Sequence, residues 1–133
     1  MNIVLDTNVL VSGLLNPSGK AAAVLNHMLS GSITLCFDSR IIDEYERVLL
    51  RPAFGFREED VKNLIGFIDY LGVTIVPKPF GHGISDPDDR PFIEVAKSAN
   101  CPVVTGNKKH FPEEHVKVYS PSEILDLLEK ADM

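Results

Sequence analysis

Four side chains stand where a folded chain could bring them together around a metal ion. Asp6 ends a run of strand-forming apolar residues, and Asn107 follows another such run late in the chain. Glu44 lies a little over one turn into a predicted helix, and Asp89 opens a later helix. Carboxylates gathered at one place repel each other at neutral pH, and a divalent cation is the common remedy. Oxygen ligands without a paired His or Cys favour Mg²⁺ or Mn²⁺ over zinc.

These residues meet only if the elements that carry them form a layered α/β domain. Short apolar runs of β character alternate with longer segments of helical periodicity, which is typical of that class. The segment 77–89 is rich in proline and glycine and predicts a loop. The predicted strands are 2–6, 33–37, 73–76, 102–105 and 116–120, and the predicted helices are 7–15, 20–30, 39–51, 57–71, 89–100 and 123–131, with Ser18 expected to cap the second helix.

Five strands joined by helices imply a mainly parallel, roughly five-stranded sheet covered by helices on both faces, because parallel neighbours need helical crossovers. In such sheets ligands bind at the carboxyl ends of the strands. Asp6 and Asn107 both fall at that edge, so we expect the sheet itself to bring them together.

The totals are those of an ordinary folded domain. With 133 residues, 44% of them hydrophobic and 24% charged, the chain fits one domain over residues 1–133. No apolar run approaches the ~18–20 residues of a membrane span, and the start lacks the pattern of a secretion signal. We therefore expect a cytoplasmic protein with no membrane partner. Cys36 and Cys101 lie in or beside apolar stretches and are expected to be free thiols.

The net charge of −6 argues against broad, nonspecific binding to nucleic acid, which depends on a surplus of Lys and Arg. A metal ion that neutralised three of the acids would leave −3, and the cations can still be grouped locally. Five of them lie near the acidic residues along the chain and are predicted to line a phosphate path: Arg47, Arg51, Arg90, Lys108 and Lys109.

Four stretches of the chain resemble, in order, the successive motifs of the PIN-domain nucleases. They are DTNVLVSGLL at the start, IIDEYERVLLRPAF in the first third, and DPDDRPFIEVAKSA and VVTGNKKHFP toward the end. The similarity extends to the PIN proteins described as toxins of bacterial toxin–antitoxin systems, of the VapC type. Because it covers nearly the whole chain, it is far more specific than a lone DTN.

The resemblance implies a PIN-like α/β/α sandwich that hydrolyses RNA phosphodiester bonds with Mg²⁺ or Mn²⁺. Residue by residue, it implies that Asp6, Glu44 and Asp89 are the acidic metal ligands. Asn107 then belongs to the catalytic set with these three acids. The resemblance also implies an RNA substrate, a protein antitoxin that blocks the acidic site, and a homodimer.

Two residues near this set are expected to support it. Thr105 matches the segment that supplies a further active-site group, and Asn8 could orient a water or a ligand by hydrogen bonding. The chain departs from the family at Asn107, where many members have Asp, and at His110, where they have Asp or a Leu-type residue. An amide oxygen is a neutral donor and adds no charge, so tight binding of a second metal ion is not implied.

Each acidic residue also has an ordinary structural interpretation. Asp6 could cap a short helix, and Glu44 could be a solvated helix residue. Asp86, Asp88 and Asp89 could all serve as turn and cap residues, and Asp88 is the predicted N-cap of the helix that follows.

The remaining polar residues have ordinary interpretations as well. Asn107 could be a turn residue, and the pair Lys108 and Lys109 an exposed polar turn. His27, His82 and His115 have no partner at ligand spacing and are interpreted as surface or core residues.

Other functions remain open at this point. A noncatalytic binding module would keep the fold and lose the chemistry, as Asn107 and the acidic net charge suggest. An RNA-processing PIN nuclease would act without an antitoxin. A receiver-type α/β domain also places Asp at strand ends, but the chain lacks the lysine expected after a late strand.

Overall fold

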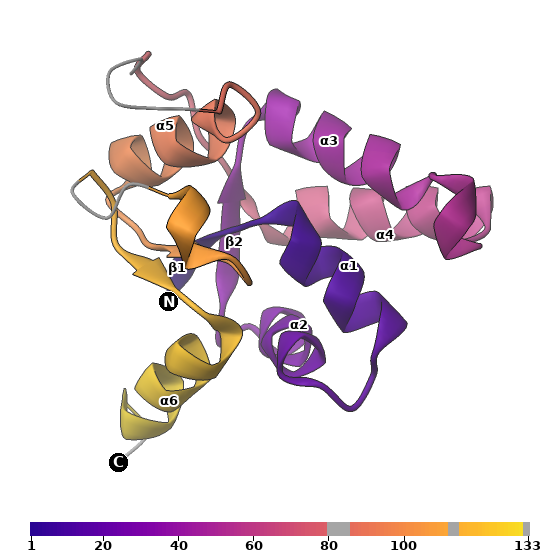
Figure 1. Ribbon diagram of the computed structural model, residues 1–133, viewed down its shortest axis with the longest axis horizontal. Coiled ribbons are helices and arrows are strands. Elements are labelled where there is room, and N and C mark those ends of the chain that lie inside the picture. Colours follow the sequence, from indigo (N-terminus) through magenta and orange to yellow (C-terminus); the bar gives the residue numbers. More distant parts are fainter. Residues whose placement is uncertain (80–85, 112–114, 132–133) are drawn as a thin grey trace.

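The computed structural model describes residues 1–79, 86–111 and 115–131 (Figure 1). Along these ranges one or two helices separate successive strands, except that between β4 and β5 the described residues contain only a 3₁₀ turn. The strands are β1 (Asn2–Leu5), β2 (Thr34–Phe37), β3 (Val73–Thr74), β4 (Val103–Val104) and β5 (Val118–Tyr119). The helices are α1 (Thr7–Leu15), α2 (Lys20–Ser30), α3 (Ser39–Leu49), α4 (Glu58–Leu71), α5 (Arg90–Ala99) and α6 (Pro121–Ala131), with 3₁₀ turns η1 (Pro52–Phe54) and η2 (Lys108–His110).

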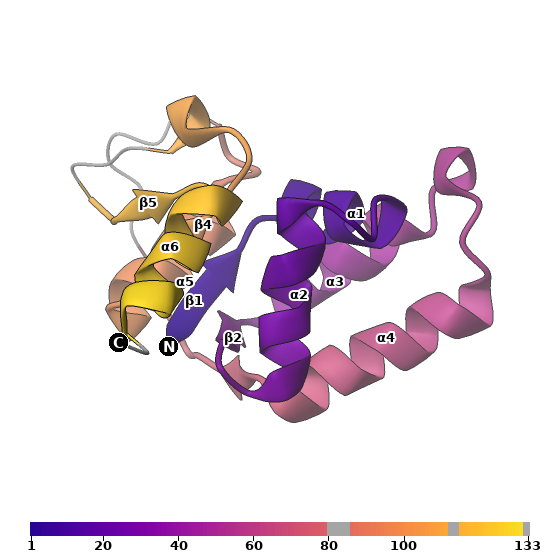
Figure 2. The ribbon, with the colours of Figure 1, turned by 90° about the horizontal axis from the view of Figure 1, so that it is seen from below.

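The strands form one parallel sheet in the order β3-β2-β1-β4-β5. Figure 2 shows β1 between β2 on one side and β4 with β5 on the other. Ile3 of β1 pairs with Leu35 of β2, and Leu5 pairs with Val104 of β4. The chain therefore builds from β1 outward to β3 and then from β4 outward to β5. The order reverses between β1 and β4, which is where open α/β sheets bind ligands.

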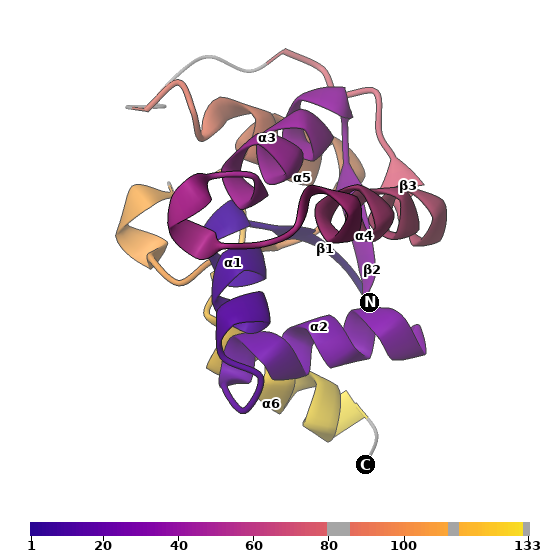
Figure 3. The same ribbon diagram turned by 90° about the vertical axis from the view of Figure 1, so that its right-hand side faces the viewer.

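Helices cover both faces of the sheet. α5 packs against β1, β2 and β4, and α3 packs against β2 and α5. α2 contacts both α1 and α6, and Figure 3 shows α3 and α5 above the sheet with α2 and α6 below it. Ile3, Val4 and Leu5 are fully buried, so β1 runs through the centre of the core. The predicted fold class, an α/β sandwich with a parallel five-stranded sheet, is confirmed.

The helix that carries Glu44 begins at a side-chain cap. Asp38 follows β2 directly, and its Oδ1 accepts a hydrogen bond from the Ile41 amide at 3.1 Å. This bond satisfies one of the amides that a helix start leaves without a partner. Ile41, Tyr45 and Leu49 then form the buried face of α3 at four-residue spacing, as the sequence predicts. Glu44 lies beside that face, and its side chain is 20% exposed.

Glycine is required where α4 turns into β3. A Cβ on Gly72 would lie 2.7 Å from the Leu35 carbonyl oxygen and closer still to the Phe37 ring. Contacts below about 3.0 Å are not tolerated against backbone atoms, so only glycine lets the end of α4 approach β2 this closely. The predicted end of this helix at Gly72 is confirmed.

Some predicted details are wrong. The N-cap of α2 is Gly19, because the Ser18 hydroxyl donates instead to Asn16 Oδ1 at 3.2 Å. The strands predicted at 73–76, 102–105 and 116–120 shorten to two residues each. β3 and β5 lie at the sheet edges, where strands are often short, whereas β4 is equally short although it pairs on both sides.

The remaining sequence predictions divide between confirmed and untested. Cys36 is buried, Cys101 is half-buried, and both are free. The middle of the predicted loop, residues 80–85 with His82, lies outside the described residues. No helix of the described ranges is long and apolar enough to cross a membrane.

Candidate active site

The ends of β1 and β4 place two predicted site residues in direct contact. Asp6 follows β1, and its amide donates to the Val104 carbonyl at 2.9 Å. The hydroxyl of Thr105, a fully buried residue that follows β4, donates to Asp6 Oδ2 at 2.7 Å. Asn8 joins the same region, because its Oδ1 accepts a hydrogen bond from the Gly106 amide at 3.4 Å. The carboxylate of Asp6 is thus oriented at the point where the strand order reverses.

Asn107 belongs to the same hydrogen-bonded segment. Its backbone amide donates to Thr105 Oγ1 at 3.0 Å, so this hydroxyl accepts from Asn107 while it donates to Asp6. The side-chain amide nitrogen of Asn107 lies 3.1 Å from His110 Nε2. The electrostatic interaction with His110 lowers the pKa of Asp6 and of Asp89, against the stronger effects that raise them. The side chains of Asn107 and His110 therefore lie at the edge of the acidic group.

Glu44 is held beside the end of β1 by contacts from two elements. The hydroxyl of Thr7, the first residue of α1, donates to Glu44 Oε2. Tyr45, the next residue of α3, donates its hydroxyl to the Leu5 carbonyl at 2.5 Å. Burial, together with nearby acidic side chains, raises the pKa of Tyr45 well above its ordinary value, so it stays a neutral donor. Arg47 Nη2 lies 3.8 Å from Glu44 Oε1 on the exposed side.

Asp89 has a carboxylate oxygen without a partner. The N-cap of α5 is Asp89, so the prediction that Asp88 is the N-cap is wrong. Asp88 lies in the turn before the helix, where its amide donates a hydrogen bond to Asp86 Oδ1 at 2.9 Å. The side chain of Asp89 makes no capping hydrogen bond. Its Oδ2 is buried and has no hydrogen-bond partner among the described residues. A buried oxygen of this kind calls for a partner that the protein itself does not supply.

Burial raises the pKa of two acids of this region, and for Asp89 the neighbouring acids add to the rise. Burial raises the pKa of Asp89 to about 6, and the charges of Asp86, Asp6 and Glu44 add to the rise. Burial also raises the pKa of Asp6, although the hydrogen bond from Thr105 opposes it. A raised pKa means that the ionised form is destabilised by its surroundings. Ionised carboxylates here are therefore under electrostatic strain that a cation would relieve.

We call Asp6, Glu44 and Asp89 the acidic rim. Their oxygens are hard ligands of the type that Mg²⁺ and Mn²⁺ prefer, and the partnerless oxygen of Asp89 fits such an ion. Among the described residues, no three His, Cys, Asp or Glu side chains are already arranged to hold a metal ion. The residues present fit a divalent cation in charge and chemistry, and binding requires their side chains to close on it.

The basic residues predicted to contact phosphates differ in their exposure and in whether a carboxylate is already paired with them. Arg90 and Lys109 are exposed, the first beside Asp89 at the start of α5 and the second on η2. Arg51 is exposed beyond the end of α3. Lys108 is half-buried, and its ammonium group lies 3.1 Å from Glu123 Oε1 on α6. Lys108 therefore already has a carboxylate partner, whereas Arg51, Arg90 and Lys109 are accessible to a substrate.

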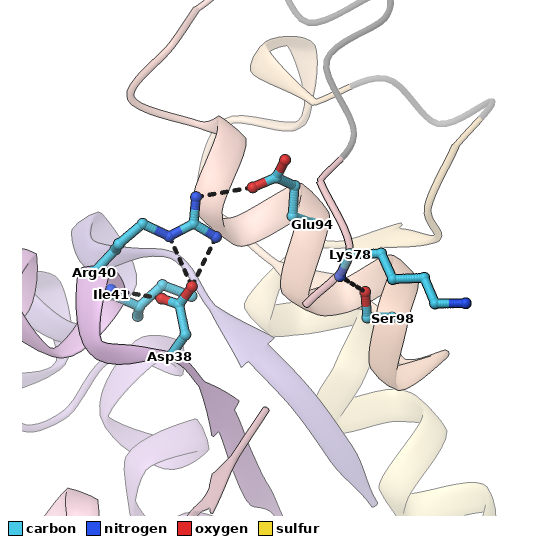
Figure 4. Close-up of polar contacts among 6 residues, drawn as sticks. All are labelled: Asp38, Arg40, Ile41, Lys78, Glu94 and Ser98. Carbon is cyan, nitrogen blue, oxygen red and sulfur yellow. Dashed lines mark hydrogen bonds and ion pairs between the residues drawn. The ribbon is translucent and has the colours of Figure 1, made fainter. Parts of the chain in front are cut away.

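Sequence reasoning missed a charged cluster beside the acidic rim. Arg40 on α3 contacts Asp38, which follows β2, and Glu94, which lies on α5 (Figure 4). We call these three residues the Arg40 cluster. Asp38 stands at the carboxyl end of its strand just as Asp6 does, so the rule that selected Asp6 could also have selected Asp38. No local pattern marks Glu94, which lies between apolar neighbours in the sequence.

Comparison with known proteins identifies the fold family. The model of the family described as PIN domain matches residues 2–109. The chain belongs to the PIN domain family. The match includes the whole acidic rim and Asn107, and it confirms the resemblance read from the four motifs. The residues that gather at the β1–β4 switch point are thus part of a PIN domain.

The chain also resembles a curated relative and solved structures over most of its length. The chain is 26% identical over 144 residues to MJ1680 of Methanocaldococcus jannaschii, described as uncharacterized, over 98% of this chain and 93% of that protein. It resembles FitAB bound to a DNA fragment, with a TM-score of 0.63 and 16% identity over 91% of this chain and 95% of that one. It also resembles VapBC2 from Rickettsia felis bound to a DNA fragment from their promoter, with a TM-score of 0.58 and 15% identity over 90% and 98%. At these identities the structural likeness shows the fold alone.

Proposed function

We propose that this PIN domain protein is a divalent-metal-dependent endoribonuclease that hydrolyses RNA phosphodiester bonds. One observation carries the proposal. Asp89 has a buried oxygen without a hydrogen-bond partner in the part of the chain that the structure describes, and it lies within the electrostatic range of Asp6 and Glu44. Such a group is unfavourable for the chain alone and suits a bound Mg²⁺ or Mn²⁺ beside a phosphate.

The acidic rim would hold the cation in this proposal. When bound, the cation supplies activation of water and neutralises the charge that develops on the phosphate. Thr105 keeps the carboxylate of Asp6 oriented through its hydroxyl, and Thr7 does the same for Glu44. Such supporting hydrogen bonds set the direction in which each ligand oxygen points. Asp89 Oδ2 has no such supporting bond within the described ranges, and in this proposal the buried oxygen itself binds the cation.

The neutral and basic residues around the rim would orient the substrate. Asn107 adds an amide and no charge, so we propose one tightly held cation. Asn8 is proposed to orient substrate or water from the first turn of α1. The exposed cations Arg51, Arg90 and Lys109 are proposed to contact RNA phosphates, with Arg47 and Lys108 joining if their acidic partners release them.

The test is cleavage of a labelled structured RNA by purified protein with Mn²⁺, Mg²⁺ or EDTA. Asp6→Asn is the test variant, and Asp69→Asn, an exposed acid on α4, is the matched control. The proposal predicts metal-dependent cutting that Asp6→Asn loses and Asp69→Asn keeps. Equal cutting by all three proteins in EDTA would reject it and favour a noncatalytic binding module. A DNA of the same sequence tests the preference for RNA.

We further propose that the protein is the toxin of a toxin–antitoxin pair and acts as a homodimer. The named complexes FitAB and VapBC2, whose fold this chain shares, support an antitoxin partner. Expression of the wild-type chain is expected to arrest growth, and co-expression of a small protein encoded beside it is expected to restore growth. Growth without arrest, with RNA cleavage retained, would favour an RNA-processing nuclease. Sedimentation equilibrium tests the dimer.

A further inference from the structure

The Arg40 cluster joins two elements through one guanidinium group. Arg40 Nε and Nη2 each lie 2.7 Å from Asp38 Oδ2, and Arg40 Nη1 lies 2.8 Å from Glu94 Oε1 (Figure 4). The side chains of Asp38 and Glu94 are only 10% and 6% exposed, whereas Arg40 is 43% exposed. Charge-assisted hydrogen bonds between a guanidinium and buried carboxylates are directional and strong. The cluster therefore fixes the position of Arg40 relative to both carboxylates.

The two elements joined in this way are the two helices of the acidic rim. Arg40 lies one turn before Glu44 on α3, and Glu94 lies in the second turn of α5, which begins directly after Asp89. Asp38 caps the same α3 through the Ile41 amide, so Arg40 binds the cap residue and α5 together. The start of α3 is thereby held at a set distance from the start of α5. That distance determines how far Glu44 lies from Asp89.

The cluster acts on the rim through geometry, because its charge does not favour the rim acids. Arg40 is offset by two carboxylates, so the cluster as a whole carries −1. All three guanidinium nitrogens of Arg40 contact carboxylate oxygens, which leaves this side chain engaged with the protein. A residue held in this way is suited to positioning its neighbours and not to contacting a phosphate.

We infer that Arg40 is a positioning residue that sets the spacing between the acid-bearing helices α3 and α5 for cation binding. The inference rests on the proposed function, since it assigns Arg40 a role at the same site. Residues that hydrogen-bond a metal ligand typically change metal affinity about 10- to 100-fold when replaced, and Arg40 acts one contact further from the rim, through Asp38 and Glu94. Arg40→Met keeps the length of the side chain and removes the bridge to Glu94. We expect the Kd for Mn²⁺ to rise at least about tenfold.

The test is calorimetric titration of the full chain with Mn²⁺, alongside thermal unfolding and RNA cleavage. Arg40→Lys keeps a charge that reaches one carboxylate at a time and is expected to recover part of the affinity. Lys62→Met is the matched control, because Lys62 pairs with Glu58 at 3.0 Å on the surface of α4, away from α3 and α5. Lys62→Met is expected to bind Mn²⁺ as the wild type does.

A double variant keeps the test decisive if Arg40→Met fails to fold. Arg40→Met/Glu94→Leu replaces the pair between α3 and α5 by apolar groups, a change that proteins often tolerate, and leaves Asp38 with its hydrogen bond from the Ile41 amide. It is expected to fold, to bind Mn²⁺ at least about tenfold more weakly, and to lose kcat at saturating RNA more than it raises KM. A merely structural role would lower the melting temperature and leave the Mn²⁺ affinity unchanged.

The outcomes separate the inference from the function on which it rests. A wild-type chain that binds Mn²⁺ while a folded Arg40 variant binds it equally well overturns the inference and leaves the proposed function standing. A wild-type chain that binds no Mn²⁺ and cuts no RNA overturns the proposed function and the role of Arg40 with it. Weaker Mn²⁺ binding by the folded Arg40 variants, partly restored in Arg40→Lys, supports both.

Discussion

Two groups of carboxylates, each with members on or directly before helices α3 and α5, have opposite surroundings. In the Arg40 cluster, Asp38 and Glu94 are almost fully buried, and both contact one guanidinium group. In the acidic rim, Glu44 lies about one helical turn after Arg40 on α3. Asp89, at the start of α5, has a pKa of about 6 and a buried oxygen that bonds to none of the residues described. The fold thus provides its own cation for one group and leaves the other short of positive charge.

From this difference we propose a structural role for the Arg40 cluster and a cation-binding role for the acidic rim. Buried carboxylates with an internal cation stabilise a fixed arrangement of helices, and breaking such a pair is costly. Carboxylates held together without a cation lower stability unless something binds to them. The rim has only Arg47, 3.8 Å from Glu44, as a basic neighbour in an ion pair among the described residues, and we propose that its acids bind an external ion. Four measurements test this comparison, in order from the largest expected effect to the smallest.

Asp89→Asn is expected to lower RNA cleavage about a thousandfold. Removing a metal ligand removes several kcal/mol of transition-state stabilisation, and each 1.36 kcal/mol is worth about tenfold in rate. Single-turnover cleavage with Mn²⁺ measures the loss. Asp88→Asn, an exposed neighbour whose amide lies in the preceding turn, serves as control and should cut normally. Wild-type rates in Asp89→Asn would show that the rim is not the site of the chemistry.

Arg40→Met is expected to lower the free energy of unfolding by about 1–3 kcal/mol, because hydrogen bonds to charged groups are lost and two buried carboxylates lose this cation. Water reaches the half-exposed guanidinium, so the loss stays below that of a fully buried pair. Urea denaturation measures it. The exposed pair of Lys62 and Glu58 provides the comparison, and Lys62→Met should change stability little. An equally small change in Arg40→Met would contradict the contrast drawn between the two groups.

Binding of Mn²⁺ is expected to weaken about tenfold for each pH unit below pH 6. Asp89 has a pKa of about 6, so the ion must displace its proton in more acidic solution. Above pH 7 the affinity should depend little on this group. Calorimetric titrations at pH 5, 6 and 7 in buffers of different ionisation enthalpy count the released protons. An affinity that stays flat from pH 5 to pH 7 would remove Asp89 from the ligand set.

The smallest effect is on the stability of the metal-free protein. The pKa of Asp89 is raised from 3.8 to about 6 on folding, so the folded state binds more protons in this interval and stability falls as pH rises through it. Asp89→Asn removes this penalty and should raise the melting temperature modestly at pH 7 and not at pH 4. The gain is modest because solvent screens a partly exposed group. Melting curves in EDTA check it, and a lower melting temperature at pH 7 would show that Asp89 stabilises the fold.

The sequence by itself determined most of the elements and part of the site. Apolar periodicity is local, so the positions of the strands and helices could be read from short windows, and so could the placement of Asp6 at a strand end. Three of the five strands came out too long, because the hydrophobic pattern does not reveal how many residues of a strand find a pairing partner. The roles of Glu44 and Asp89 came from resemblance to the family, since an acid on a helix carries no local signal of its own.

Only the tertiary structure decided which side chains meet. The strand order places β4 beside β1, and this alone brings the Thr105 hydroxyl to Asp6, 99 positions away. The packing of α3 against α5 likewise brings Arg40 to Glu94, 54 positions away, and defines the cluster that sequence reasoning missed. Such contacts depend on sheet order and helix packing, which arise from the burial of the whole core. Local residue preferences do not contain that information.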